Sequence, residues 1–233
     1  MQGHPKSNYR HLPKGLEIIY EDGAIIVVDK PPGMLTMGTE KEKERTAYFA
    51  ITDYVRKGYS RSSKRIFIVH RLDRETSGIV IFARTEKAKY QLQDNWKETW
   101  KKYLAVVHGR CDKQFGTITS YLAENKAHVV YSTDDKEKGK LSHTAYRVLK
   151  ETKDFSLLEV DLLTGRKHQI RVHLAGIGNP IVGDRKYGKA DDGHKRIALH
   201  ALSISFKHPV SSEEVFLTTK VPAYFDSLVG GMN

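Results

Sequence analysis

The chain has 233 residues, of which 39% are hydrophobic and 29% are charged, and Cys111 is its only cysteine. This composition indicates a globular protein rather than a disordered one, with room for one large domain or two small ones. A lone cysteine excludes an intramolecular disulfide. The polar start lacks the apolar core of a secretory signal, and no apolar run is long enough to span a membrane, so we expect a cytoplasmic protein with no membrane partner.

The charge is strongly basic and unevenly distributed. Lysine and arginine number 39 against 28 acidic residues, a formal net charge of +11. Between Ile51 and Arg110 there are 14 basic and 6 acidic residues, a local net charge of +8. A concentrated basic surface favours a polyanionic partner such as nucleic acid, and the alternative is a solvated basic face that aids solubility.

The first half of the chain predicts strands separated by two helices. The apolar positions of the first helix fall on one face, and Thr85 is a suitable N-cap for the second. The predicted elements are strands at 16–20 and 24–28 around a turn at 21–23, a helix containing Ala47, Ala50, Ile51, Tyr54 and Val55, strands at 65–69 and 78–83, and a helix from Glu86 to about Glu98.

In the second half, turns join most of the predicted elements. These are a strand at 103–107, a charged loop at 136–140, a hairpin of 143–149 and 155–162, a short helix at 169–175 that Gly176 ends, and a strand at 197–206. Strands joined by turns predict an α+β fold, with a mixed, mainly antiparallel central sheet and flanking helices and loops. We expect residues 1–14 to be a flexible N-terminal segment and residues 15–233 to form a single domain.

Several common catalytic patterns are absent from the sequence. There is no cysteine pair for zinc, no His-Glu-x-x-His, no phosphate-binding loop, no dinucleotide-binding turn and no Gly-x-Ser-x-Gly elbow. We therefore expect no metal and no other cofactor, and an enzyme with this sequence would act through its side chains alone.

The segment His70-Arg71-Leu72-Asp73-Arg74 joins a predicted strand to a buried one. Neighbouring cations favour the ionised form of a carboxylate, and an ionised carboxylate at the end of a rigid strand can act as a nucleophile or base. The alternative is structural, since an aspartate in such a loop can cap the turn or pair with an arginine.

Two later segments combine basic side chains with features of a binding site. Tyr103 follows Lys101 and Lys102 at the start of a strand, where an aromatic ring can stack on a nucleobase while lysines bind phosphate. Six of the twelve residues from Leu163 to Leu174 carry polar nitrogen groups, which suit contacts to phosphates and base edges. The alternatives are an ordinary sheet tyrosine and an amphipathic surface helix.

Taken together and in order, these segments resemble the RluA-type pseudouridine synthases. The resemblance extends from about Glu17 to about Tyr224 and departs from the family pattern at no motif position. The matching segments are Ala24 to Gly33, His70-Arg71-Leu72-Asp73 with Thr76-Ser77-Gly78, Lys102-Tyr103, Gly165 to His173, Pro180 to Asp184 with Tyr187-Gly188, and Leu199-His200-Ala201.

The resemblance implies the pseudouridine synthase catalytic fold and isomerisation of uridine in RNA without a cofactor. It implies that Asp73 is the essential aspartate, that Tyr103 stacks on the target uracil and that Arg171 pairs with Asp73. The remaining residues that the resemblance and the basic segments assign to RNA or substrate binding are His70, Arg71, Arg74, Lys102, Arg166, Lys167, His168 and Leu199. Of these, Arg71 would fill the space left by the flipped nucleotide and Leu199 would form an apolar wall.

The chemical role of Asp73 stays open among attack on the base, attack on the sugar and removal of a sugar proton. The expected substrate is a stem-loop in large-subunit (23S) ribosomal RNA, in tRNA or in both, because the pattern starts too early for the S4-type RNA-binding domain of many relatives. We expect a monomer with no obligate protein partner. The alternative function is a catalytically silent RNA-binding or ribosome-assembly factor on the same scaffold, and a small-substrate hydrolase would need a second carboxylate or a metal.

Overall fold

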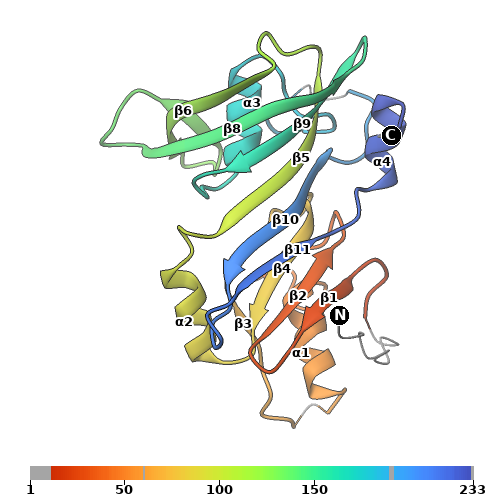
Figure 1. The fold of residues 1–233 in the computed structure, drawn as a ribbon, viewed down its shortest axis with the longest axis vertical. Coiled ribbons are helices and arrows are strands. Elements are labelled where there is room, and N and C mark those ends of the chain that lie inside the picture. The colour runs from red at the N-terminus through yellow and green to blue at the C-terminus, as the bar shows by residue number, and fades with distance from the viewer. Residues whose placement is uncertain (1–11, 60, 189–191, 232–233) are drawn as a thin grey trace.

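A computed structural model describes residues 12–59, 61–188 and 192–231. In these residues a single mixed sheet of eleven strands runs through the molecule, and four helices pack against it (Figure 1). The predicted α+β class with a mainly antiparallel sheet is therefore confirmed. The expected flexible segment 1–14 falls mostly on residues 1–11, which lie outside the described residues.

The sheet has one principal path of nine strands. In spatial order these are β1 (Glu17–Glu21), β2 (Ile25–Lys30), β4 (Ser77–Ala83), β10 (Leu199–Lys207), β5 (Trp100–His108), β9 (Phe155–Leu162), β8 (Lys140–Glu151), β6 (Phe115–Glu124) and β7 (Val130–Thr133). Two further strands lie off this path, β3 (Phe67–Ile68) on β4 and β11 (Glu214–Thr218) on β10. Among the described strands, β4 and β10 form a parallel pair and the other pairs are antiparallel.

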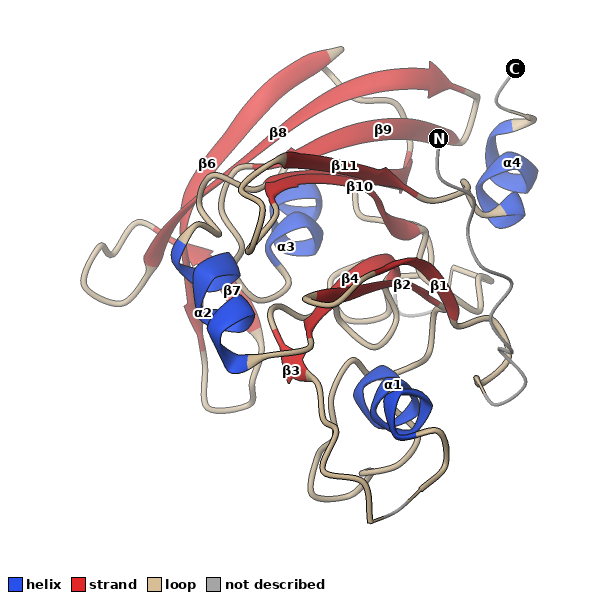
Figure 2. Ribbon diagram, turned by 60° about the horizontal axis from the view of Figure 1, so that its bottom comes forward, coloured by secondary structure: helices blue, strands red, loops and turns tan. Residues whose placement is uncertain are grey.

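The helices lie on the faces of this curved sheet (Figure 2). They are α1 (Ala47–Arg56), α2 (Glu86–Asp94), α3 (Gln169–Gly176) and α4 (Ala223–Val229). Thr46 and Thr85 begin the first two helices by accepting a hydrogen bond from the backbone N–H three residues later. Strands β6, β8 and β9 curve over α3, which contacts β6, β7 and β8 (Figure 2). No helix in the described ranges combines the length and apolar character needed to cross a bilayer.

The sequence predicted the elements that have strong apolar periodicity, and it did not predict several exposed or short ones. The first hairpin, α1, β4, β5, the β8–β9 hairpin, α3 and β10 are confirmed, with boundaries shifted by a few residues. The predicted strand at 65–69 shrinks to Phe67–Ile68, and α2 ends at Asp94 rather than near Glu98. The sequence analysis missed β6, β7, β11 and α4, because β6 and β11 expose many of their side chains and β7 and α4 are short.

The core follows from the two-residue periodicity of the central strands. Ile26 and Val28 of β2, with Val80 and Phe82 of β4, belong to the larger apolar cluster, which also contains buried residues of α1. The alternate residues of the same strands face a second cluster, to which Ala88 and Leu92 of α2 belong. Strand β4 is therefore buried along its whole length and fixes the loop that precedes it.

The β4–β10 junction brings distant parts of the chain together. Gly78 has a φ of +112°, and a Cβ atom there would lie 2.2 Å from the carbonyl oxygen of Ala201. Only glycine therefore allows the two backbones to approach this closely. Beside it, Ser77 Oγ and His200 Nδ1 are 2.9 Å apart and His200 Nε2 is 2.7 Å from Thr219 Oγ1. The junction places the residues before β4 next to the starts of β10 and β5.

Buried His173 makes the stability of this fold sensitive to acid. The side chain is 1% exposed, and burial followed by the charge of His143 lowers its pKa to about 4. Between pH 4 and the unfolded-state pKa of about 6.5, the unfolded chain binds a proton that the folded chain does not. The free energy of unfolding should therefore fall as the pH falls through this range, by about 1.4 kcal/mol per pH unit from this group.

His173→Gln should make that fall shallower by about 1 kcal/mol per pH unit, measured by urea unfolding between pH 4.5 and 6.5. Half-buried Asp29, whose pKa desolvation and Glu17 raise to about 6, acts in the opposite direction in both proteins and cancels in the comparison. Parallel plots of the free energy of unfolding against pH for the two proteins would rule out this role for His173.

Candidate active site

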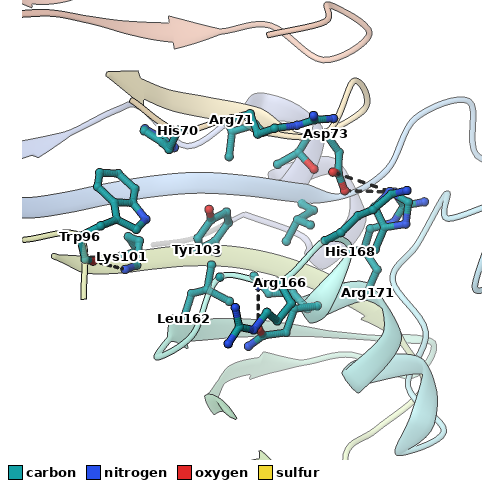
Figure 3. A pocket seen from close by; sticks show the side chains of 17 residues that line it. His70, Arg71, Asp73, Trp96, Lys101, Tyr103, Leu162, Arg166, His168 and Arg171 are labelled. Carbon is teal, nitrogen blue, oxygen red and sulfur yellow. Dashed lines mark hydrogen bonds and ion pairs between the residues drawn. The ribbon is translucent and has the colours of Figure 1, made fainter. Parts of the chain in front are cut away.

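A pocket of about 450 Å³ opens where the β3–β4 loop, the start of β5, the start of β10 and the start of α3 meet (Figure 3). It contains eight of the predicted site residues together with Asp73. Its lining residues are His70, Arg71, Leu72, Asp73, Thr76, Trp96, Lys101, Tyr103, Leu162, Gly165, Arg166, Lys167, His168, Gln169, Ile170, Arg171 and Leu199. Segments that lie about a hundred residues apart in the sequence thus form one cavity.

Backbone hydrogen bonds fix the loop that carries Asp73. The buried hydroxyl of Thr36 accepts a hydrogen bond from Leu72 N–H at 3.1 Å and donates one to Leu72 O at 2.9 Å. On the other side of Asp73, the ammonium of Lys30 donates to Arg74 O at 3.3 Å and to Met34 O at 2.8 Å. Lys30 is fully buried, and desolvation lowers its pKa to about 8 despite the nearby acids. The carboxylate is therefore held on a rigid turn.

Arg171 connects Asp73 to a second aspartate, Asp184. Its Nε and Nη2 atoms donate to the two carboxylate oxygens of Asp184, each at 2.8 Å, and Nη1 donates to Asp73 Oδ2 at 3.2 Å. The Arg171 and Asp184 side chains are 6% and 1% exposed, and that of Asp73 is 22% exposed. The arrangement leaves Asp73 as the member of this group that is open to the pocket (Figure 3).

Electrostatics stabilise the charged forms in this group. Burial disfavours the charged form of Arg171, but the hydrogen bonds and charges of Asp184 and Asp73 outweigh it and raise the pKa of the guanidinium. Burial also opposes ionisation of Asp184, and the paired guanidinium reverses the effect and lowers its pKa. Arg171 therefore stays charged beside Asp73, the residue with which the family resemblance pairs it.

His168 lies on the same side of Asp73. Its Nε2 is 3.8 Å from Asp73 Oδ1, and its Nδ1 is 2.6 Å from the hydroxyl of Tyr187. Desolvation lowers its pKa, an effect that the charge of Asp73 offsets only in part. His168 is therefore neutral at physiological pH and can accept or donate a hydrogen bond to a bound ligand.

Tyr103 provides the aromatic surface of the pocket. It is 8% exposed, and burial together with the charge of Asp73 raises the pKa of its hydroxyl, so the ring stays neutral. Side chains alternate along β5, so Lys101 and Tyr103 share the pocket side of the strand. Lys102 points to the other face, where it pairs with Glu159 at 2.7 Å. The structure does not bring Lys102 into the pocket.

The other predicted residues take different positions. Arg71 is exposed at the rim, and Leu199 is a buried part of the wall. Arg166 and Lys167 line the pocket, with Lys167 paired to Glu124. Arg74 pairs with Glu42 and does not line it.

His70 does line the pocket, although its Nε2 accepts a hydrogen bond from Ile81 N–H. Burial and then Lys101 lower its pKa to about 3, so it is neutral. Its ring lies 4.6 Å from that of Trp96.

The sequence analysis missed several residues that form or support the site. Asp184 and Tyr187 were in the matching segments but received no role, and their own chain positions gave no sign that they contact Arg171 and His168. Trp96 was predicted only to lie within the helix from Glu86 to about Glu98, which in the structure ends at Asp94. Lys30 and Thr36 act through backbone contacts that no local pattern reveals. In the part of the chain that the structure describes, no group of three His, Cys, Asp or Glu side chains is arranged to hold a metal ion.

Comparison with known proteins agrees with this geometry. The family model for RNA pseudouridylate synthase matches residues 24–176. The chain belongs to the RNA pseudouridylate synthase family. It is 36% identical to "Ribosomal large subunit pseudouridine synthase C" of Rickettsia bellii, over 90% of this chain and 69% of that protein. It is 35% identical to "Uncharacterized RNA pseudouridine synthase YlyB" of Bacillus subtilis, over 93% of this chain and 73% of that protein.

Solved structures support the same conclusion. "Human RNA Pseudouridylate Synthase Domain Containing 1" superposes with a TM-score of 0.75 and 27% identity, covering 92% of this chain and 86% of that one. "Human RNA Pseudouridylate Synthase Domain Containing 4" has a TM-score of 0.74 and covers 90% of each chain; at 23% identity it supports the fold alone. As a member of this family the protein is an RNA pseudouridine synthase, an isomerase that converts uridine in RNA to pseudouridine.

Asp184→Asn tests whether Asp184 positions Arg171. The amide removes one charged acceptor, so the guanidinium should lose its fixed direction and the free energy of unfolding should fall by about 3 kcal/mol. We expect kcat for uridine isomerisation to fall by about a hundredfold with a small change in KM. Both constants are measured under conditions in which circular dichroism shows that the variant is folded.

Asp134→Asn, at an exposed position in the turn after β7, is the matched control and should leave the free energy of unfolding, kcat and KM unchanged. A folded Asp184→Asn enzyme with normal kcat would show that Asp184 serves stability alone.

Proposed function

We propose that Asp73 is the catalytic carboxylate of this synthase and that the target uracil lies on Tyr103. The observation that carries the proposal is the juxtaposition of a carboxylate, a buried guanidinium that fixes it, and an aromatic surface in one pocket (Figure 3). Arg171 keeps its proton and its charge at physiological pH, so its role toward Asp73 is to hold and orient the carboxylate. Leu199 forms an apolar wall beside the base.

The reaction exchanges one bond of the ribose for another. The C1′–N1 bond breaks, a C1′–C5 bond forms, C5 loses its proton and N1 gains one. Each of the three open roles for Asp73, attack on the base, attack on the sugar or removal of a sugar proton, requires an ionised carboxylate held near the glycosidic bond. A carboxylate on a rigid turn beside Arg171 suits all three.

The target nucleotide must leave its helix or loop stack to reach this pocket. Exposed Arg71, which makes no ion pair with the described residues, lies at the rim and is suited to fill the vacated space. Arg166, Lys167 and His168 line the opposite side and are suited to bind phosphate. The basic surface between Ile51 and Arg110 would guide the RNA backbone, with an affinity that falls as salt rises.

We propose a stem-loop of large-subunit ribosomal RNA as the substrate, with tRNA as the second candidate. Support comes from relatives named as ribosomal large subunit pseudouridine synthases, including the C enzyme of Rickettsia bellii and the D enzyme of Borreliella burgdorferi. We further propose a single catalytic domain, because all eleven described strands join one sheet. We also propose that the protein is a cytoplasmic monomer.

Mapping of pseudouridine in cellular RNA, with and without this gene, tests the substrate. Positions that revert to uridine on deletion and return when the gene is restored identify the target. Reversion confined to tRNA would exclude ribosomal RNA as the substrate.

Asp73→Asn should abolish isomerisation, by at least about a thousandfold in kcat/KM, because the amide is uncharged and neither attacks nor accepts a proton. Tritium release from RNA containing 5-tritiated uridine measures the loss, and RNA affinity should stay close to wild type. Asp94→Asn, exposed at the end of α2, is the matched control. Substantial activity in Asp73→Asn would exclude the assignment. An inactive wild type that binds RNA tightly would instead support the silent RNA-binding alternative.

Tyr103→Phe and Tyr103→Leu separate the ring from the hydroxyl. The hydroxyl has no hydrogen-bond partner among the described residues, so Phe should retain activity within about tenfold. Leu removes the stacking surface, which is worth about 1–3 kcal/mol per base, so its kcat/KM should fall about tenfold to a hundredfold. Equal losses in both variants would assign the role of Tyr103 to its hydroxyl.

A further inference from the structure

A second cavity adjoins the first pocket, and neither Tyr103 nor Asp73 lines it. It has a volume of about 370 Å³ and shares His168 and Arg171 with the first pocket. Four further basic side chains line it, with one acidic side chain and little else; these are Arg185, Lys186, Lys195 and Arg196, with Glu75. We call this cavity the basic groove. None of its four further cations was singled out by the sequence patterns.

The cations of the basic groove are largely free of acidic partners. Arg185 and Lys195 are exposed, and neither forms an ion pair with the residues that the structure describes. Lys186 donates to His128 O at 2.8 Å, and the guanidinium of Arg196 lies 4.3 Å from the centre of the Tyr224 ring. Both of these contacts leave the positive charge unneutralised. Cations gathered in a concave surface repel one another, and a bound polyanion would relieve that repulsion.

The two segments that carry these cations are fixed against each other. Gly183 has a φ of +77°, and a Cβ atom there would lie 2.0 Å from the carbonyl oxygen of Arg196. Ala198 N–H donates to Val182 O at 2.9 Å, and Gly183 N–H donates to Asp192 Oδ2 at 2.6 Å. The backbones beneath Arg185 and Arg196 are therefore held in place. The groove is part of the folded framework rather than a chance meeting of two loops.

The groove lies where the backbone of a bound nucleotide must pass. Tyr103 and Asp73 lie at different ends of the pocket (Figure 3), so a uracil placed on Tyr103 with its glycosidic bond at Asp73 would direct its ribose away from Tyr103. Arg171 and His168, which flank Asp73, line both cavities, so the ribose leaves the pocket at the groove. A phosphate is the next group along the strand, and arginine and lysine side chains are its usual partners.

We propose that the basic groove binds the RNA backbone phosphates adjacent to the target uridine, with Arg185 and Lys195 as the principal contacts. The proposal rests on the proposed placement of the uridine between Tyr103 and Asp73. Glu75 opposes phosphate binding, so the groove contains a residue whose neutralisation should tighten binding. Glu75 Oε2 also lies 3.9 Å from Arg171 Nη1, at the boundary of the two cavities. Opposite effects from Glu75 and from the two cations, larger than those of charge changes outside the groove, indicate a phosphate site, because general basic charge predicts equal effects in both places.

The test is equilibrium binding of a fluorescent hairpin RNA with a uridine-rich loop, in the Asp73→Asn background so that no RNA is converted. Arg185→Glu with Lys195→Glu should raise Kd by at least about tenfold and reduce the slope of log K against log salt by about 1.5, because two phosphate contacts are lost. Glu75→Gln should lower Kd by about twofold to fivefold.

Lys136→Glu with Lys140→Glu, both exposed between the end of β7 and the start of β8 and outside the groove, is the matched double charge-reversal control and should change Kd by less than about twofold. Equal effects from the groove variant and this control would show that only general basic charge matters and would overturn the proposal. An unchanged slope of log K against log salt in the groove variant would also overturn the proposal. So would a Glu75→Gln variant that binds the RNA no more tightly than its parent. Wild-type isomerisation of the same hairpin separates the two proposals, because an inactive wild type counts against the proposed function rather than against the groove.

Discussion

The site depends on one buried guanidinium and the two carboxylates that hydrogen-bond to it. Arg171 is almost fully enclosed, and a charge in that position is tolerated only when it is paired and hydrogen-bonded. Asp184 satisfies it through two parallel hydrogen bonds, which fix the plane of the guanidinium. The remaining nitrogen then has a fixed direction, and Asp73 lies in that direction. The requirement to pair a buried charge thereby becomes a means of orienting the carboxylate that we propose to be catalytic.

The sheet places these groups within reach of one another. Asp73 precedes β4, Leu199 begins β10 and Tyr103 lies near the start of β5, and these three strands are neighbours. The close approach of β4 to β10 requires glycine at position 78, where a methyl group would collide with the Ala201 backbone. Helix α3, under the curved strands β6 and β8, supplies Arg171 from the other side. The rigidity of the sheet is what makes the site a fixed arrangement.

The Arg171–Asp73 pair also separates two environments that differ in chemistry. On one side lies a pocket with an aromatic surface, a neutral histidine and an apolar wall, which suits a nucleobase. On the other side lies a groove rich in exposed cations, which suits phosphates. A nucleotide has the same polarity, with a flat base at one end, a charged phosphate at the other and the glycosidic bond between them. The proposed position of Asp73 at the boundary matches the position of the bond that the enzyme must break.

The sequence alone determined the fold class, the family and the segments that form the pocket, because strand periodicity, turn residues and motif order are local properties. It predicted the pairing of Arg171 with Asp73 only through resemblance. The tertiary structure decided the rest. In the structure Lys102 points away from the pocket and pairs with Glu159, and Arg74 pairs with Glu42. Four residues to which the sequence patterns assigned no role contact the site, namely Asp184, Tyr187, Lys30 and Thr36. It also gathered the cations of the basic groove from two separate segments. Which side chains meet across a sheet depends on strand order and on the face each residue takes, and neither is encoded in any single segment of the chain.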